Sequence, residues 1–498
     1  MRTKNAFKIV LSSIILQVII VISGLILPKL LIEVYGSTIN GLVSSIKQLL
    51  NYLSVITLGL GAASQVALYK PLKEKKYSEI NGILSATRIF FNKTGYVFIV
   101  ISILATIIYP FIILSEVNYF TTMFIMIIVS VGSIIQYTIL SKYTILLVAD
   151  QRNYIASKIA AEGIIINTVI TIFLIYIRAS IEMVQLVGTI VYIFRLFTTI
   201  NYVKKNYPYV DYYAKPNFES ISGRWQVFSY EISGVIILYT PMILITLFCG
   251  LNEASVFSVY NMVFSSLCMI VNVFVAGFSA SFGNVIVEEN ISLLRKTYNT
   301  YEYIYNNILY ICYTCAIILI IPFIKVYIKN DDGVNYVVPL IGIMFALSGL
   351  TRGIRTPCVT LVEAANKFKE NKLANIFEAI SNVLLSFLFI FNYGIVGVLF
   401  ANLVTSLIRS ILYIFYSYKN ILKTKPFKII LVLTLNSLLM YIMVKVINVK
   451  ECYTMLDWFI QAIKVSVITT LSFVALNSII NFEAAKDLII RIKLLLKK

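Results

Sequence analysis

The sequence alternates long apolar runs with short polar patches from one end to the other. Most runs are about 20 residues long, which matches the hydrocarbon core of a bilayer, roughly 30 Å thick, at about 1.5 Å of helical rise per residue. The pattern predicts an all-α integral membrane protein with about fourteen transmembrane helices. We place them at 9–32, 39–69, 94–114, 119–148, 154–177, 181–202, 226–250, 254–287, 303–328, 335–362, 372–392, 394–418, 427–449 and 454–481.

The positions of lysine and arginine agree with this number of helices and predict the orientation. If the N-terminus is inside, most of the 42 basic residues fall in segments that face the cytoplasm, as the positive-inside rule requires. Both termini then lie in the cytoplasm. The first apolar run is too long for a cleaved signal peptide and follows Arg2, Lys4 and Lys8, so we expect it to stay as a membrane span.

Composition narrows the chemistry that this chain can perform. Hydrophobic residues make up 59% and charged residues 13%, against about 45–50% and about 25% in soluble domains. The chain has no histidine, and its six cysteines lie mostly in apolar runs, so we predict no catalytic residues, no metal site and no cofactor. The net charge of +19 is explained by anionic lipid at the inner surface, without nucleic acid as a partner.

The longest polar loop, residues 203–225, divides the predicted helices into groups. It separates an N-lobe of six helices (1–202) from a C-lobe of six (226–420), and residues 421–498 add two helices and an amphipathic cytoplasmic tail. A weak parallel repeat supports this division. In each lobe a similar segment connects the fourth span to the fifth: LVADQRNYIASKIAAEGIIINTV in the first and LVEAANKFKENKLANIFEAISNV in the second. Each lobe also carries an arginine in its sixth span, Arg195 and Arg409.

Basic side chains inside spans are the first candidates for a site, since each costs about 2.5–3.5 kcal/mol to insert. Lys47 lies in the second span, and Arg352 and Arg355 share one face of the tenth. Two adjacent guanidinium groups repel unless an anion, an acid or water lies between them. We predict a cationic cavity for a phosphate group, lined by Lys47, Arg352 and Arg355. Arg195 and Arg409 are weaker candidates for the same lining. The alternative is that their side chains reach the lipid head groups.

A few other polar residues lie inside predicted spans. Glu231, in the seventh, is a candidate for a coupling proton or ion. Asn261 and Asn272 lie on one face of the eighth, where they could bind sugar hydroxyls or hold helices together. Glu162 and Glu378 recur in the fifth helices of the two lobes, where we expect each to pair with a nearby lysine.

Several segments resemble a known family over essentially the whole chain. The first two spans contain IEVYGSTINGLVSSIKQLLNYLSVITLGLGAASQVALYKPL, and the second half begins with LNEASVFSVYNMV followed by FSASFGNVIVEEN. The chain is similar to the polysaccharide transporter (Wzx-type flippase) family of the multidrug/oligosaccharidyl-lipid/polysaccharide (MOP) superfamily. That resemblance implies two lobes around a central cavity, lined by the first, second, seventh and eighth helices, to which Lys47 and Glu231 would contribute.

The resemblance also implies a function and partners. Members move undecaprenyl-pyrophosphate-linked oligosaccharide across the bacterial cytoplasmic membrane, and helices thirteen and fourteen could hold the polyprenyl tail, as in lipid II flippases. Partners would be this lipid, the surrounding membrane lipids and the polysaccharide polymerase machinery. Two alternatives stay open: a cation-coupled multidrug antiporter of the same superfamily, and a membrane polysaccharide polymerase or ligase. The coupling ion and the sugar are not specified by the sequence.

Overall fold

The computed structural model describes the chain except residues 1, 58–59, 114–115, 223, 288–289, 330–331, 366, 368–371 and 497–498. Side chains are described for the remaining residues apart from 2–7, 57, 60, 224–231, 273–281, 283–287 and 491–496. Every regular element in this described part is helical, which confirms the all-α class. Contacts divide the chain into two compact units, residues 1–259 and 260–498, called here the first and the second unit.

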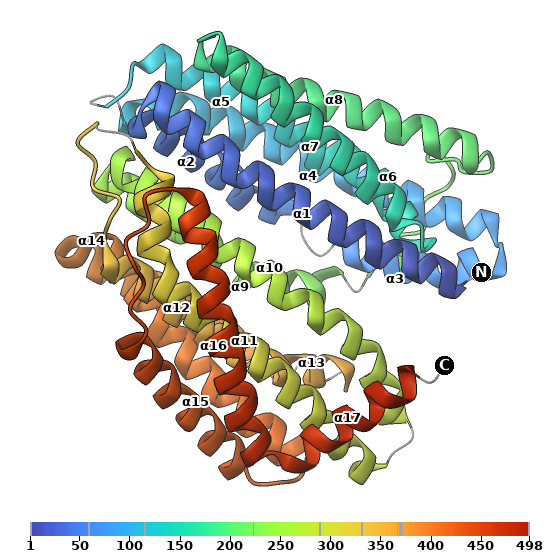
Figure 1. The fold of residues 1–498 in the computed structure, drawn as a ribbon. Helices are drawn as coiled ribbons and strands as arrows, with labels where there is room; N and C mark the ends of the chain where they lie inside the picture. Colours follow the sequence, from blue (N-terminus) through green and yellow to red (C-terminus); the bar gives the residue numbers. More distant parts are fainter. Residues whose placement is uncertain are drawn as a thin grey trace. The chain divides into compact units, whose positions relative to one another are not determined.

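The first unit consists of nine α-helices, three short helical segments and the beginning of a tenth α-helix (Figure 1). In chain order these are α1 (Arg2–Tyr35), α2 (Ser37–Leu53), η1 (Ser54–Thr57), α3 (Leu60–Glu74), α4 (Tyr77–Ile112), α5 (Tyr119–Ile134), η2 (Ile135–Leu140), α6 (Ser141–Ala149), α7 (Asn153–Tyr176), α8 (Ile181–Asn206), η3 (Glu219–Ile221), α9 (Arg224–Cys249) and α10 (Leu251–Val287). Within this unit α1 packs along α7, α7 packs on α8, and α9 packs on α2 and α3.

The second unit contains the rest of α10 and seven further α-helices. They are α11 (Ile291–Tyr327), α12 (Pro339–Ile354), α13 (Thr356–Ala364), α14 (Lys372–Tyr416) with the short η5 (Ser417–Ile421), α15 (Phe427–Val446), α16 (Met455–Ile480) and α17 (Phe482–Leu496). Figure 1 shows α15 and α16 beside α11, and α11 also packs against α12.

The described residues contain 11 helices long and apolar enough to cross a membrane, or 12 if the bent pair from Ser37 to Glu74 is one span. Only helices satisfy every backbone group within one segment of chain, so this many apolar helices make a multi-pass membrane protein. Gly394 interrupts α14 at a positive φ of 53°, between the predicted spans 372–392 and 394–418. The number fourteen stays a prediction.

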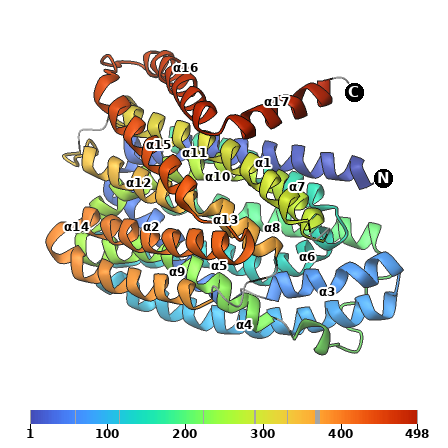
Figure 2. The same cartoon turned by 90° about the horizontal axis from the view of Figure 1, so that it is seen from below.

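Two helices begin well before the spans predicted from hydropathy. We predicted spans at 94–114 and 303–328, whereas α4 begins at Tyr77 and α11 at Ile291. The added turns are polar, and hydropathy does not detect them. In the first unit they have a structural role, because Ile80, Ile83 and Leu84 of α4 are buried in a cluster with α3, α6 and the loop after α8. Figure 2 shows α3 and α4 side by side.

The loop after α8 is packed against the first unit. Asn81 of α4 donates to the Tyr209 carbonyl oxygen (3.0 Å), and its side-chain oxygen accepts from the Asp211 amide (3.0 Å). The Asn217 amide donates to the Gly82 carbonyl oxygen (2.9 Å), and a Cβ at Gly82 would lie 3.3 Å from Asn217 Cβ. This close fit makes residues 207–222 part of the first unit, within the predicted linker 203–225. The predicted lobe boundary itself stays a prediction.

Three asparagines hold the last two long helices against α11. Asn477 of α16 donates to Asn307 of α11 (3.1 Å) and to Asn436 of α15 (3.0 Å), and all three side chains are buried. Hydrogen bonds between side-chain amides of different helices stabilise membrane bundles, where apolar contact alone supplies little driving force. The predicted tail is the helix α17, which packs Ala484 and Ala485 against α11.

Candidate functional site: a cationic cavity in the first unit

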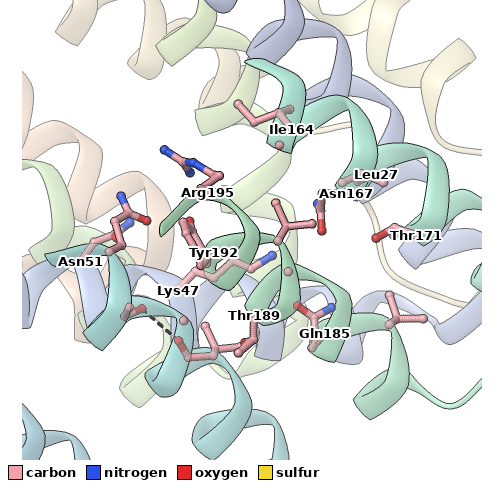
Figure 3. Close-up of a pocket in the computed structure, with 18 of the residues that line it drawn as sticks. Leu27, Lys47, Asn51, Ile164, Asn167, Thr171, Gln185, Thr189, Tyr192 and Arg195 are labelled. Carbon is pink, nitrogen blue, oxygen red and sulfur yellow. Dashed lines mark hydrogen bonds between the residues drawn. The ribbon is translucent and has the colours of Figure 1, made fainter. Parts of the chain in front are cut away.

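A cavity of about 260 Å³ lies among α1, α2, α5, η2, α7 and α8 (Figure 3). All of its lining residues belong to the first unit. Its polar lining consists of Lys47, Asn51, Ser133, Gln136, Tyr137, Asn167, Thr171, Gln185, Thr189, Tyr192 and Arg195. The lining contains two basic side chains and, among its described residues, no aspartate or glutamate. The cavity therefore carries a net positive charge.

The two basic residues come from helices far apart in the sequence. Lys47 is on α2 and Arg195 on α8, and Figure 3 shows the Lys47 ammonium pointing into the cavity. The guanidinium of Arg195 lies 5.3 Å from the centre of the Tyr192 ring. Within the described part of the chain, neither basic group has a carboxylate within 4.0 Å. The structure thus brings together two of the predicted site residues and leaves both charges available to a ligand.

Two polar atoms of the cavity lining are buried without a hydrogen-bond partner in the described structure. They are Nε of Arg195, a donor, and Oδ1 of Asn167, an acceptor. Asn51, by contrast, already accepts from the Tyr137 hydroxyl (2.7 Å). Buried polar atoms are normally paired, so the free donor and acceptor are suited to a polar ligand or to water.

A glycine on α7 allows Arg195 to reach the cavity. A Cβ at Gly163 would lie 2.7 Å from Cδ of Arg195, 2.9 Å from its Cγ and 3.1 Å from Cγ1 of Val191. The arginine stem therefore crosses α7 where only a glycine leaves room. Because glycine inside a helix costs about 1 kcal/mol relative to alanine, its presence here is explained by this close approach.

In the second unit the predicted basic residues are arranged differently. Arg355 donates to Oε1 of Glu378 (2.8 Å), and Arg409 bonds to Oε2 of the same carboxylate. The Glu378 side chain is 1% exposed and both arginine side chains are largely buried. Our expectation that Glu378 pairs with a lysine is wrong, because these two arginines reach it from α12–α13 and from α14. Glu162 does pair with a lysine, Lys158, at 3.8 Å.

Among the described residues, Arg355 of the predicted pair has an acidic partner and Arg352 has none. The helix α12 ends at Ile354, and Arg355 donates to Glu378, an acid that it shares with Arg409. Nε of Arg352 is buried with no partner among the described atoms. Arg355 and Arg409 share one carboxylate, so the cluster keeps one net positive charge, and the role of both arginines in substrate binding stays a prediction.

Arg195 and Arg409, the arginines in the sixth predicted spans of the two lobes, differ in their partners. Glu162 and Glu378 lie at similar places in the two fifth spans. In the second unit Glu378 contacts Arg409, whereas in the first unit Glu162 pairs with Lys158. Arg195 has no acidic partner among the described side chains and lines the cavity. The sequence alone could not distinguish the two arginines.

Of the remaining predicted residues, Asn261 and Asn272 do not line this cavity, and Glu231, which lies in α9, is outside the described side chains. Asn261 is partly buried and Asn272 is exposed, with its amide 3.5 Å from Sγ of Cys268. No group of three potential metal ligands is found among the described residues.

The sequence did not single out Asn167 and Gln185, the two amides of the cavity that lie on α7 and α8. Their only signal is a polar side chain inside an apolar run. Such a signal is common in membrane helices, where amides often join one helix to another.

Comparisons with known proteins agree with this architecture. Residues 255–447 match the family model described as polysaccharide biosynthesis protein. No curated protein sequence matches significantly. The fold is similar to that of the lipid II flippase MurJ in an inward closed conformation, with a TM-score of 0.72 and 18% identity over 96% of this chain and 99% of that one.

Two multidrug-type structures are also similar. An inward-facing multidrug resistance MATE family transporter gives a TM-score of 0.64 with 12% identity, over 82% of this chain and 95% of that chain. A MOP superfamily transporter from Pyrococcus furiosus, described as having a binding pocket of reverse polarity, gives a TM-score of 0.59 with 13% identity, over 83% of this chain and 96% of that chain. The predicted resemblance is confirmed: the chain has the fold of the MOP superfamily transporters, and its residues 255–447 match the polysaccharide biosynthesis family.

Proposed function

We propose that this protein is a flippase for undecaprenyl-pyrophosphate-linked oligosaccharide. It would carry the lipid from the inner to the outer leaflet of a bacterial cytoplasmic membrane, with both termini in the cytoplasm, and so supply cell-surface polysaccharide synthesis. Alternating access would expose the cavity to one side at a time. The match to the polysaccharide biosynthesis family and the fold shared with a lipid II flippase support this proposal.

The observation that carries the proposal is a cavity whose described lining contains two basic side chains and no carboxylate. Lys47 and Arg195 line the same cavity, and Nε of Arg195 is a donor without a partner among the described atoms. Arginine fits phosphate oxygens with two parallel hydrogen bonds, and lysine adds a compact charge. In a medium of low dielectric constant a pyrophosphate would offset the cost of keeping both basic groups there.

The size of the cavity indicates which part of the substrate enters it. Its volume of about 260 Å³ is below the roughly 300–1,000 Å³ typical of sites for drug-sized ligands. We therefore assign it to the pyrophosphate and adjoining groups, with the tail left in the lipid. In the second unit, α16 has an apolar surface groove that suits an isoprenoid tail, formed by Phe459, Ala462, Ile463, Ser466, Val467, Thr470 and Leu471.

A multidrug antiporter is the second candidate, because the fold is shared with MATE transporters. Such a transporter would exchange a cationic drug for a proton or sodium ion and would need a carboxylate in its cavity. Lys47 and Arg195 would repel both kinds of ligand. The charge of the cavity therefore favours the flippase. A polymerase or ligase is not favoured by any feature of the site.

The proposal can be tested in cells whose surface polysaccharide depends on this protein. Lys47→Met and Arg195→Gln are each expected to lower surface polymer severalfold, and the double variant to abolish it, because both remove charge from the cavity. Gly163→Ala is expected to lower it as well, since the added methyl group displaces Arg195 and leaves all charges in place. Polymer is measured by quantitative immunoblotting, with membrane levels of each variant as reference.

Lys158→Met is the matched control. Lys158 is an exposed lysine of α7 that pairs with Glu162 outside the cavity, so its loss should leave polymer unchanged. Normal polymer in the double variant would refute the proposed function of the cavity. Equal loss in the control and the cavity variants would show that the effect is not specific to the cavity.

A further inference from the structure

Glu302 of the second unit is a carboxylate well inside the long helix α11, and the described residues show no basic partner for it. Among the described residues, Glu33 pairs with Lys29, Glu162 with Lys158, and Glu378 with two arginines. Glu302, on α11, has no lysine or arginine nitrogen within 4.0 Å in that part of the chain. It is partly buried, and it belongs neither to the cavity nor to the cluster around Glu378.

The Glu302 carboxylate is surrounded by hydroxyl and thiol groups from three elements. The Tyr418 hydroxyl of η5 donates to Oε2 at 2.6 Å. The Tyr298 hydroxyl, one turn earlier on α11, also faces the carboxylate and lies 3.2 Å from Sγ of Cys358 on α13. The rings of Tyr298 and Tyr418 meet edge to face, with their centres 6.0 Å apart. The carboxylate thus joins α11 to the end of α14.

The charged groups around this cluster lie further away. Lys428 of α15 acts on Glu302 only through space. Arg295 of α11 is held by backbone carbonyl oxygens, with Nε 2.8 Å from that of Leu422 and Nη2 2.9 Å from that of Lys423. The ionised form of Glu302 is therefore stabilised by neutral donors, which also suit the protonated form. A carboxyl group in such surroundings changes charge more readily than one that is fixed by a guanidinium.

We propose that Glu302 is a proton-binding site, and that its charge controls how tightly η5 is held against α11. A proton from cytoplasmic water converts the carboxylate to the acid. The strong bond from Tyr418 to a charged acceptor then becomes a weaker bond between neutral groups. Proton uptake therefore loosens the contact between α11 and the end of α14. This site is independent of the proposed lipid substrate.

Infrared spectroscopy of the purified full-length protein tests this directly. The carbonyl band of a protonated carboxyl group is recorded in membranes without added lipid substrate, at a series of pH values from about 5 to about 9. We expect a band that grows as the pH falls and that Glu302→Gln removes. Glu33→Gln, which alters a partly exposed acid paired with Lys29, is the matched control and should leave this band in place.

Tyr418→Phe provides a second test that keeps the glutamate. It removes the donor to the charged form, so the midpoint of the band should move to higher pH by about one pH unit. A purely structural role for Glu302 would leave this midpoint unchanged. The proposal is overturned if no pH-dependent carboxyl band is lost in Glu302→Gln, or if Tyr418→Phe leaves the midpoint in place. Neither result depends on lipid transport.

Discussion

Glu378→Gln is expected to cost about 3–5 kcal/mol of stability, because it leaves two buried guanidinium groups without their carboxylate. Arg355 and Arg409 both bond to Glu378, and none of the three side chains has free access to water. Glutamine keeps the size of the side chain but supplies one neutral acceptor oxygen. The midpoint of thermal unfolding in detergent should fall clearly, with loss of monodisperse protein.

The repeat provides a matched control for this change. Glu162→Gln alters the corresponding acid of the first unit, whose partner Lys158 is one helical turn away with its side chain 71% exposed. Such exposed pairs contribute about 0.3–0.5 kcal/mol, so the unfolding midpoint should hardly move. Equal midpoints for Glu378→Gln and the natural protein would show that the cluster around Glu378 does not stabilise the second unit.

Gly41→Ala is expected to disrupt the packing between α2 and the start of α10 within the first unit. A Cβ at position 41 would lie 1.9 Å from the carbonyl oxygen of Leu251, a backbone atom that cannot move alone. The same contact is held by Asn40, which donates to Ser255 (2.7 Å) and Ser258 (3.1 Å). Overpacking of this kind typically costs about 1–3 kcal/mol, and here it also breaks the bonds of Asn40.

Glu116 strengthens this contact, since its Oε2 accepts from the Leu251 amide at 2.8 Å. Thermal stability and surface polymer should therefore both fall in Gly41→Ala. Gly61→Ala is the control, because a Cβ there meets only Cδ1 of Ile145 at an ordinary 3.9 Å, and alanine favours the helix. If the two variants behave alike, the close approach of α2 and α10 is not important for stability.

Hydropathy identified the membrane helices because a helix that crosses the bilayer needs about 20 consecutive apolar residues. It also located the interruption of α14, where Gly394 lies at a positive φ between two predicted spans. It missed the first turns of α4 and α11. These turns are polar, and those of α4 are packed by a loop more than 100 residues later in the chain, which no local pattern reveals.

The candidate site could be predicted only in part. Lys47 and Arg195 were selected because charge inside a membrane is costly, and both line the cavity. The same argument selected Arg355 and Arg409 equally, although both contact the carboxylate of Glu378 and lie outside this cavity. Glu378 is 23 residues from Arg355 and 31 residues from Arg409 in the sequence, so whether they pair depends on how α12 and α14 pack. Sequence spacing gives no such information without the fold.

The central claim is that the cavity of the first unit binds the anionic head group of a polyprenyl lipid. The most direct test is the affinity of the purified protein for undecaprenyl pyrophosphate, compared with uncharged undecaprenol. We predict that Lys47→Met and Arg195→Gln each weaken binding of the pyrophosphate about tenfold or more, as expected for loss of a charged hydrogen bond, and leave undecaprenol binding unchanged. Equal affinity of the natural protein and the double variant for the pyrophosphate would contradict this account.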